Sequence, residues 1–353
     1  MSNLRQPATE TSNVANERDR GRRARRPTEI PVRGWLDVCW RAVKRFNDDN
    51  TTLVAGGLAM YALLSVFPAL AAIVSIYGIF ATPADVIEQM SGFAGVLPPG
   101  VWDIFNTDLQ AIAKTRSATL TTAAALSIVL ALWSARAAMS SLMTATNIAY
   151  GERETRGFIK TTLLSLAFTV GAILGFLVML ALGVVIPLAL AAFGAAEWAQ
   201  AVVAVLRGAL LWAVMVLGLA GVYRYAPARE HARWRWVTVG SVFAATLCLV
   251  SSAAFAFYVT NFAGYAQTYG ALGGFVVLLM WFFISSIVVV LGAQINAEME
   301  RQTVEDTTDL RNAPLGKRGA FAADTVGPSV SSGKAATQSE PVPTAETDGP
   351  GKH

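Results

Sequence analysis

Two arginines lie inside long apolar runs of this sequence, where an ionisable side chain is costly and usually functional. Arg207 lies within the run 201–223, about two turns from one end, and Arg136 lies within the run 118–140, about one turn from the other end. Either guanidinium could bind an anionic substrate group or pair with an internal acid. Either could instead extend to the phosphates of a membrane surface. Both residues are therefore candidates for a substrate path, and the surface alternative stays open for each.

The last apolar run carries a second set of polar candidates. Ser285 and Asn296 share one helical stripe with Gly292, Trp281 lies a turn earlier, and Gln294 is close by. Small and hydroxyl-bearing residues let membrane helices approach and hydrogen-bond. The same stripe could also form the polar wall of a cavity. Packing and a substrate path are both open for these residues.

Aromatic residues and one proline complete the set of candidates. Tyr258 and Tyr269 lie close to one loop, together with Tyr265. Tyrosines in such positions form the aromatic belt at a membrane interface, and binding of a sugar or lipid headgroup is the alternative. Pro68 lies in the middle of the first apolar run. It predicts a helix kink, because proline frees a backbone carbonyl and clashes with the preceding turn.

The sequence contains few residues that could catalyse hydrolysis. The chain has only two histidines, His231 and His353, whereas a metal-dependent nuclease needs clustered ligands and a metal-free one needs a paired acid and base. No phosphate-binding P-loop is visible either. The sequence therefore predicts no enzyme, no metal and no cofactor, and active transport would require an ion gradient or a partner subunit.

The composition of the chain indicates that the candidate residues lie on transmembrane helices. Of 353 residues, 54% are hydrophobic and 15% charged, with a mean hydropathy of +0.46, whereas soluble domains carry roughly a quarter charged residues. The charge gathers at both ends and in two short loops, which leaves runs of the length needed to cross a bilayer. The sequence predicts an all-α polytopic membrane bundle of about six transmembrane helices, near 54–80, 118–140, 161–189, 201–223, 237–259 and 271–295.

Basic residues in the loops predict the orientation, because short cytoplasmic loops carry the excess of Lys and Arg. The loops 141–160 and 224–236 are rich in arginine, whereas 82–117 holds only Lys114 and Arg116. We therefore expect a multi-pass protein of the inner (plasma) membrane with both termini in the cytoplasm. The net charge of +4 indicates contact with anionic lipid headgroups rather than nucleic acid.

Segments outside the six runs differ in character. Residues 1–33 and 301–353 are polar and predict disordered cytoplasmic tails on either side of a membrane domain at 34–300. Within that domain, residues 34–47 predict an amphipathic interfacial helix, on a stripe formed by Trp35, Val38, Ala42 and Phe46. Two amphipathic stretches in 82–117 predict an external helical cap.

Glycines four residues apart occur twice, at Gly171 and Gly175 and at Gly270 and Gly274. This spacing is typical of dimerising membrane helices, although glycine-rich spans also contain it by chance. A homo-oligomer therefore stays open as an alternative to a monomer.

Several local patterns in the apolar region together resemble the YihY/BrkB family. They lie in order at 58–68, 133–135, 147–150, 222–227, 257–259, 269–273 and 291–297. The resemblance covers about 47–297 and implies a polytopic inner-membrane protein of unsettled biochemical function. Members have been linked to virulence and serum resistance, and many carry an old ribonuclease label. Gln294 stands where the family usually has Glu.

Three functions follow as hypotheses. The first is a transporter, exporter or lipid-handling permease for an unidentified substrate, which requires a polar cavity near the middle of the membrane. The second is a non-transporting scaffold in cell-envelope assembly. The third, a ribonuclease, lacks the residues that its chemistry needs.

Overall fold

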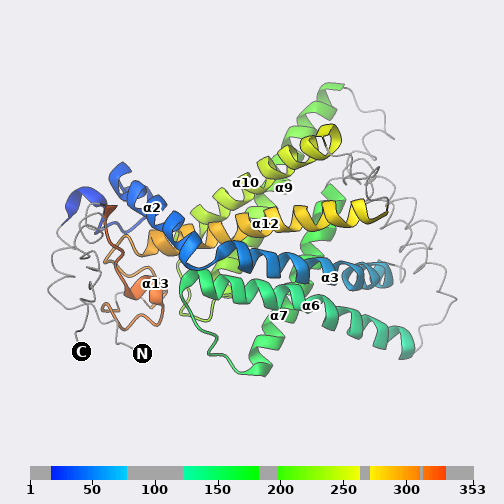
Figure 1. Cartoon of the computed structure of the whole chain (residues 1–353), viewed down its shortest axis with the longest axis horizontal. Helices are drawn as coiled ribbons and strands as arrows, with labels where there is room; N and C mark the ends of the chain where they lie inside the picture. The colour runs from blue at the N-terminus through cyan, green and yellow to red at the C-terminus, as the bar shows by residue number, and fades with distance from the viewer. Residues whose placement is uncertain (1–16, 78–121, 183–196, 263–270, 311–312, 331–353) are drawn as a thin grey trace, which may run out of the picture.

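The computed structural model describes residues 17–77, 122–182, 197–262, 271–310 and 313–330. Within them, six long helices occupy the six predicted runs (Figure 1). They are α3 (Thr51–Tyr77), α6 (Thr122–Tyr150), α7 (Phe158–Leu180), α9 (Glu197–Tyr225), α10 (Trp234–Phe262) and α12 (Ala271–Glu300). The predicted all-α polytopic membrane bundle is confirmed.

Within the described residues, four of the long helices have the composition of membrane spans. In the described part of the chain, the apolar stretches of α7, α9, α10 and α12 are long enough to cross a bilayer, and α3 contains a shorter one. Large apolar side chains on these helices face outward: Val205 is 73% exposed and Leu217 is 65% exposed. Helices that are apolar on all sides are typical of lipid-facing segments.

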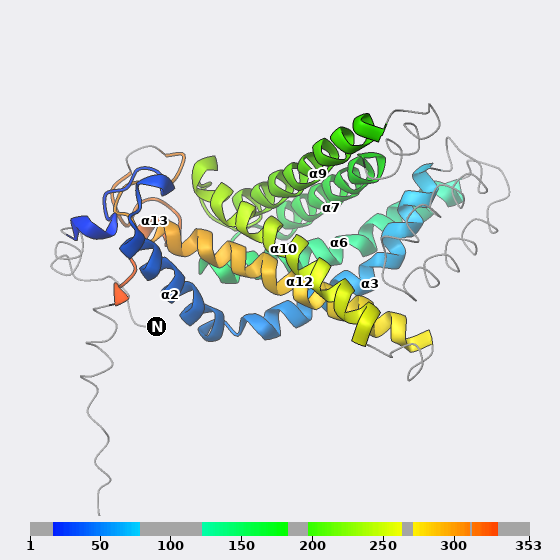
Figure 2. The same ribbon diagram turned by 90° about the horizontal axis from the view of Figure 1, so that it is seen from above.

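The helices form a ring that is tight at one end. α3 packs between α6 and α12, α6 also packs against α7, and α10 packs between α9 and α12. α7 and α9 lie side by side on one side of α12 (Figure 2). The helices converge near α2 (Val32–Asp48) and fan apart in the other direction (Figure 1). We call the convergent end, with residues 17–50, 147–157, 224–236 and 298–330, the polar end.

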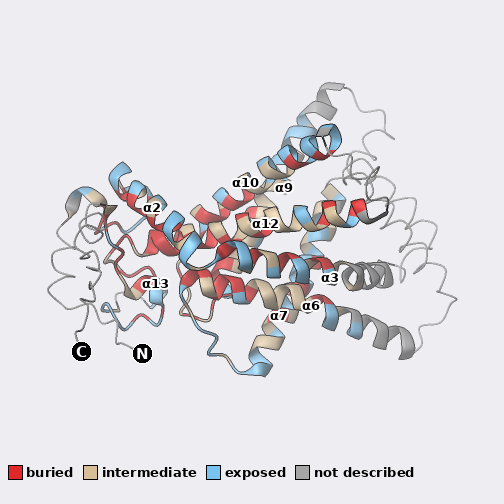
Figure 3. Ribbon diagram, in the orientation of Figure 1, coloured by how far each residue is buried: buried red, intermediate tan, exposed pale blue. Residues whose placement is uncertain are grey.

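Small residues allow this convergence. Buried side chains concentrate toward the polar end (Figure 3). The cluster there is rich in alanines, which let backbones approach closely. They are Ala145, Ala149, Ala220, Ala232, Ala244, Ala293, Ala297 and Ala322.

The closest helix crossing joins α10 to α12. The Gly240 backbone N–H donates to Asn296 Oδ1 at 2.7 Å, and Asn296 Nδ2 donates to the Val237 carbonyl at 3.0 Å. A Cβ atom on Gly240 would lie 2.2 Å from the Gly292 carbonyl oxygen. Asn296 and Gly292 therefore serve helix packing, one of the two roles that their stripe left open.

The helix α2 is amphipathic, and its predicted apolar stripe packs against the rest of the protein, whereas the sequence predicts that it lies on the membrane surface. Val38 and Ala42 are buried, and Val38 packs with Trp236 and Met299. The exposed apolar residues of α2 are Val32, Leu36 and Val43. The reason is electrostatic: Asp37 and Arg41 find oppositely charged partners in Arg20 and Glu298, so the face that carries them turns inward.

The described parts of the terminal segments are folded, although their composition predicts disorder. Residues 17–33 form two short 3-10 turns, η1 (Arg18–Arg20) and η2 (Pro27–Glu29), and Arg22 is fully buried. Beyond α12, residues 313–330 include the short helix α13 (Phe321–Asp324) and the buried Arg318. Hydrogen bonds and ion pairs hold both segments more than apolar area does, so a composition argument misses them.

Some predicted features lie outside the described residues. These are the external cap at 82–117 and the residues Tyr265, Tyr269 and Gly270. Pro68 lies inside α3, which continues to Tyr77.

Gly240→Ala tests whether the crossing of α10 and α12 requires glycine. The added methyl group would overlap the α12 backbone, and we expect a loss of about 1–3 kcal/mol in unfolding free energy. Gly171→Ala in α7 is the matched control, because a Cβ there has no atom within 4 Å and alanine favours helix by about 1 kcal/mol. Thermal unfolding in detergent measures both, and equal melting temperatures would contradict the close crossing.

Candidate functional site

A hollow of about 490 Å³ lies between α3 and α6. All but one of its lining side chains carry a polar atom. They are Tyr61 of α3 and Trp133, Ser134, Arg136, Ala137, Ser140, Ser141 and Thr144 of α6. A concave surface with several polar side chains, on two helices of a membrane protein, is a candidate binding site.

Arg136 is the charged group of this hollow. Its guanidinium carbon lies 4.1 Å from the centre of the Trp133 ring, a distance at which a cation is attracted to the ring face. Its Nε is buried and donates to no acceptor in the described residues. None of the ion pairs between described residues includes Arg136. The charge therefore remains available to an anionic ligand.

The helix α6 continues past the end of the predicted span. The predicted span ends at 140, whereas α6 continues to Tyr150, so Arg136 is followed by further helical turns before the polar end. The helix passes through a polar stretch because hydroxyls there bond to their own backbone: Thr144 Oγ1 donates to the Ser140 carbonyl at 3.1 Å.

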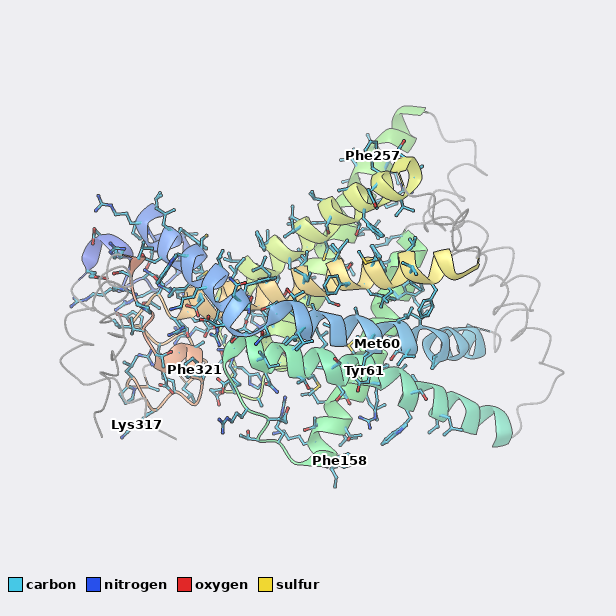
Figure 4. The ribbon with its side chains drawn as sticks, in the orientation of Figure 1. Met60, Tyr61, Phe158, Phe257, Lys317 and Phe321 are labelled. Carbon is cyan, nitrogen blue, oxygen red and sulfur yellow. The ribbon has the colours of Figure 1, made fainter. Side chains whose placement is uncertain are left out.

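Apolar surface adjoins the hollow. Met60 and Leu64 of α3 are 48% and 60% exposed, and Leu130 of α6 is 57% exposed. Met60 and Tyr61 lie next to each other in the middle of α3 (Figure 4). The site can thus hold an anionic group at Arg136 while an attached apolar chain remains against the outer helix faces.

Ion pairs at the polar end form a separate cluster, centred on Glu300 of α12. Both guanidinium nitrogens of Arg229 donate to its carboxylate, at 2.8 and 2.9 Å, and both side chains are fully buried. Arg229 also lies over the Tyr150 ring at 4.1 Å, and Thr307 Oγ1 donates to Glu300 at 3.0 Å. Burial opposes the charge on Arg229, but Glu300 outweighs it and raises the pKa of Arg229 above its ordinary value.

Glu298, two residues earlier, accepts from three guanidinium groups. Arg41 and Arg301 each donate to it at 2.7 Å, and Arg45 donates at 3.2 Å. Arg41 also donates to Gln302 Oε1 at 2.7 Å. These bonds join α2 to the end of α12, so the carboxylate fixes the position of the entry helix.

Gln294 connects α12 to the junction of α2 and α3. Its Nε2 donates to Thr51 Oγ1 at 2.8 Å and to Asp49 Oδ2 at 3.2 Å. Its Oε1 is buried and accepts no hydrogen bond from the described residues. Burial raises the pKa of Asp49. The amide suits this place because it donates to a neighbouring carboxylate without adding a second charge.

The predicted site residues do not gather at one place. Arg136 alone lines the hollow between α3 and α6. Asn296 and Gln294 hold helices together at the polar end, and Ser285 is half-buried on α12. Arg207 lies on α9 and Tyr258 on α10, and Tyr269 is outside the described residues.

Sequence reasoning missed the residues around Arg136, although a signal was present. Trp133, Ala137, Ser140, Ser141 and Thr144 recur at intervals of one helical turn, so one face of α6 is polar within a membrane run. Tyr61 had no such local signal, because only the packing of α3 against α6 brings it to the hollow.

The described residues contain no candidate metal site, because no group of three or more His, Cys, Asp or Glu side chains among them is placed to hold an ion. His231 lies in the loop between α9 and α10, against the Tyr225 ring at 5.0 Å. Burial lowers the pKa of His231.

The chain matches known proteins over most of its length. The family model described as virulence factor BrkB matches residues 42–316. A relative in Bacillus subtilis (strain 168), called putative ribonuclease-like protein YfkH, is 31% identical over 253 residues, which cover 69% of this chain and 88% of that protein.

Two further relatives are called UPF0761 membrane proteins. The one from Tolumonas auensis is 28% identical over 265 residues, covering 74% of this chain and 83% of the relative. The one from Vibrio vulnificus, VV0203, is 26% identical over 281 residues, covering 76% and 84%. No solved structure matches the chain significantly.

Arg229→Ala tests the buried pair at the polar end. Because it leaves the Glu300 carboxylate buried without its partner, we expect a loss of about 3–5 kcal/mol in unfolding free energy. Arg153→Ala, at an exposed arginine of the neighbouring loop, is the control and should change stability by less than about 0.5 kcal/mol. The measurement is thermal unfolding of the purified protein in detergent. Similar losses in both variants would show that the pair is not the anchor.

Proposed function

We propose a transport function for this chain, which belongs to the virulence factor BrkB family. In this proposal the protein is a permease that binds an anionic amphiphile, such as an anionic phospholipid, and moves it across the bilayer. The chain is a membrane protein of that family. What we propose in addition is that it transports a substrate and that this substrate is an anionic amphiphile.

The observation that carries the proposal is the Arg136 side chain in its hollow. A guanidinium on a helix of a membrane bundle is costly unless a partner compensates its charge, and among the described residues that partner is the Trp133 ring. A phosphate group would supply two acceptors in the bidentate geometry that guanidinium favours. The hydroxyls of Ser134 and Tyr61 line the same hollow and can bond to the rest of a headgroup.

Orientation and membrane contact complete the proposal. Exposed cations at the polar end, among them Arg25, Arg33 and Lys44, support a cytoplasmic location for that end by the positive-inside rule. The exposed apolar face of α2, with Leu36 and Val43, would then lie in the headgroup region of the inner leaflet.

A scaffold without transport is the alternative. The ion pairs of Glu298 and Glu300 with α2 and with the α9–α10 loop favour a rigid polar end, as a scaffold needs. This alternative predicts that Arg136 is dispensable. We propose no ribonuclease activity, because the whole chain has two histidines, in a loop and at the end, and general acid–base cleavage of RNA usually requires a pair.

The decisive experiment compares Arg136 variants in liposomes that contain fluorescent phosphatidylglycerol or phosphatidylcholine. Exposure of labelled lipid to an external quencher gives the rate of movement. We expect the native protein to accelerate the anionic lipid and Arg136→Ala to slow it about tenfold or more, because a hydrogen bond to a charged group contributes about 1.5–3 kcal/mol. Arg136→Lys should retain part of the rate, since it keeps the charge without the planar fork.

Arg153→Ala, which changes an exposed loop arginine, is the matched control and should keep the native rate. Equal rates for native protein and Arg136→Ala would remove the hollow from the mechanism. No acceleration of either lipid by the native protein would favour the scaffold.

A further inference from the structure

Residues 313–330 cross the polar end as one folded segment, which we call the strap. It contains α13 and lies beside α2 and the end of α12 (Figure 1). Most of it follows the family match, which ends at residue 316. Ala322, Ala323 and Val326 are buried, so the strap packs against the bundle.

The strap is ordered internally by one arginine and one aspartate. Arg318 is 4% exposed and donates to the carbonyls of Val304, Glu305 and Ala323 at 2.7 to 3.1 Å. The Asp324 carboxylate accepts from the backbone of Arg318 at 3.0 Å. The segment therefore has a defined shape when it meets the helices.

Its first contact is with the connection between α6 and α7. The Phe321 backbone N–H donates to Glu152 Oε1 at 2.6 Å. The Phe321 ring lies against Gly151, which has a φ of +70°, and a Cβ there would come 2.7 Å from the ring. Glycine is needed at this position for both its conformation and the ring contact.

The second set of contacts involves α12 and the connection between α9 and α10. The Glu230 backbone N–H donates to the Gly319 carbonyl at 3.0 Å. Arg301, just after α12, donates from Nε to Thr325 Oγ1 at 3.1 Å, and its carbonyl accepts from the Gly327 N–H at 2.9 Å.

The third set of contacts is with α2. Gly327 lies so close to Arg41 that a Cβ on it would be 2.5 Å from Arg41 Nε. Arg41 Nη1 donates to the Pro328 carbonyl at 3.0 Å, and the Val330 N–H donates to Asp37 Oδ1 at 2.9 Å. The strap thereby ends on the same arginine that pairs with Glu298.

We propose that the strap is an autoinhibitory clasp that holds the polar end of the bundle closed. It ties the α6–α7 connection, which no ion pair with Glu298 or Glu300 holds among the described residues, to α2 and α12, and these parts must separate if a permease is to open at this end. Its outer contacts are chiefly single hydrogen bonds, and Phe321 is 37% exposed, so the strap can release the α6–α7 connection while the buried pairs keep α2 and the α9–α10 connection on α12. That the strap inhibits transport rests on the proposed transport function. That the strap holds the polar end closed does not.

Accessibility of Cys248 tests the clasp without any substrate. This thiol on α10 is half-buried against the cluster that α12 closes, and Cys39→Ser removes the exposed thiol on α2. In that background we expect Phe321→Ala, Gly327→Val and truncation after Asn312 to raise the rate of maleimide labelling by about fivefold or more, as loss of one or two kcal/mol of closure implies.

Two controls match these variants. Leu315→Ala changes a strap residue with the same exposed fraction as Phe321, 37%, and truncation after Val330 keeps the strap; both should label at the native rate. Unchanged labelling in Phe321→Ala and Gly327→Val would overturn the clasp. The truncation is compared only if it elutes as folded protein, and the two point variants decide the matter otherwise.

Lipid movement in the same variants separates the two proposals. Faster labelling together with faster movement of phosphatidylglycerol supports both. Faster labelling without lipid movement in any variant supports the clasp and contradicts the permease. Arg136-dependent lipid movement with unchanged labelling and unchanged rates in the strap variants supports the permease and contradicts the clasp.

Discussion

The burial of two carboxylates at the end of α12 is the constraint on which the polar end depends. Glu298 and Glu300 are both fully buried, and an ionised carboxylate in such a place requires charged partners with good geometry. The partners come from α2 (Arg41) and from the loop between α9 and α10 (Arg229). Segments far apart in the sequence must therefore meet at α12, and this meeting fixes the convergent end of the ring.

The rest of the bundle is held differently. Beyond the crossing of Gly240 and Gly292, the helices expose large apolar side chains, and lipid takes the place of protein contacts. The molecule thus joins a rigid, charged end to a loosely packed apolar part. The hollow of Arg136 lies between α3 and α6, where the charged end meets the apolar part of the bundle. Polar residues of α6 continue from it toward Tyr150. A binding site in that position has a firm support on one side and room for movement on the other.

Sequence reasoning predicted the part of the structure that depends on long apolar runs. It placed all six helices, because such runs have few alternatives in a membrane, and it singled out Arg136. It ended the second helix too early, since hydroxyls that bond to their own helix allowed α6 to extend ten residues past the predicted end at 140. It also predicted disorder for residues 313–330, because that segment has little apolar area, whereas Arg318 and Arg41 hold it through carbonyl groups. Tertiary pairing of this kind leaves no periodic trace in a sequence.

The contrast between arginines indicates where a ligand is needed. Arg229 and Arg41 are buried beside carboxylates, and for Arg229 the carboxylate outweighs the loss of hydration. Arg136 has the Trp133 ring, and a cation–π contact contributes only about 0.5–2 kcal/mol. Arg136 is half-buried, so it keeps part of its hydration and needs less compensation than a fully buried guanidinium. The hollow beside it leaves space for water or for an anion, and an anion is the ligand that the proposed transport function requires.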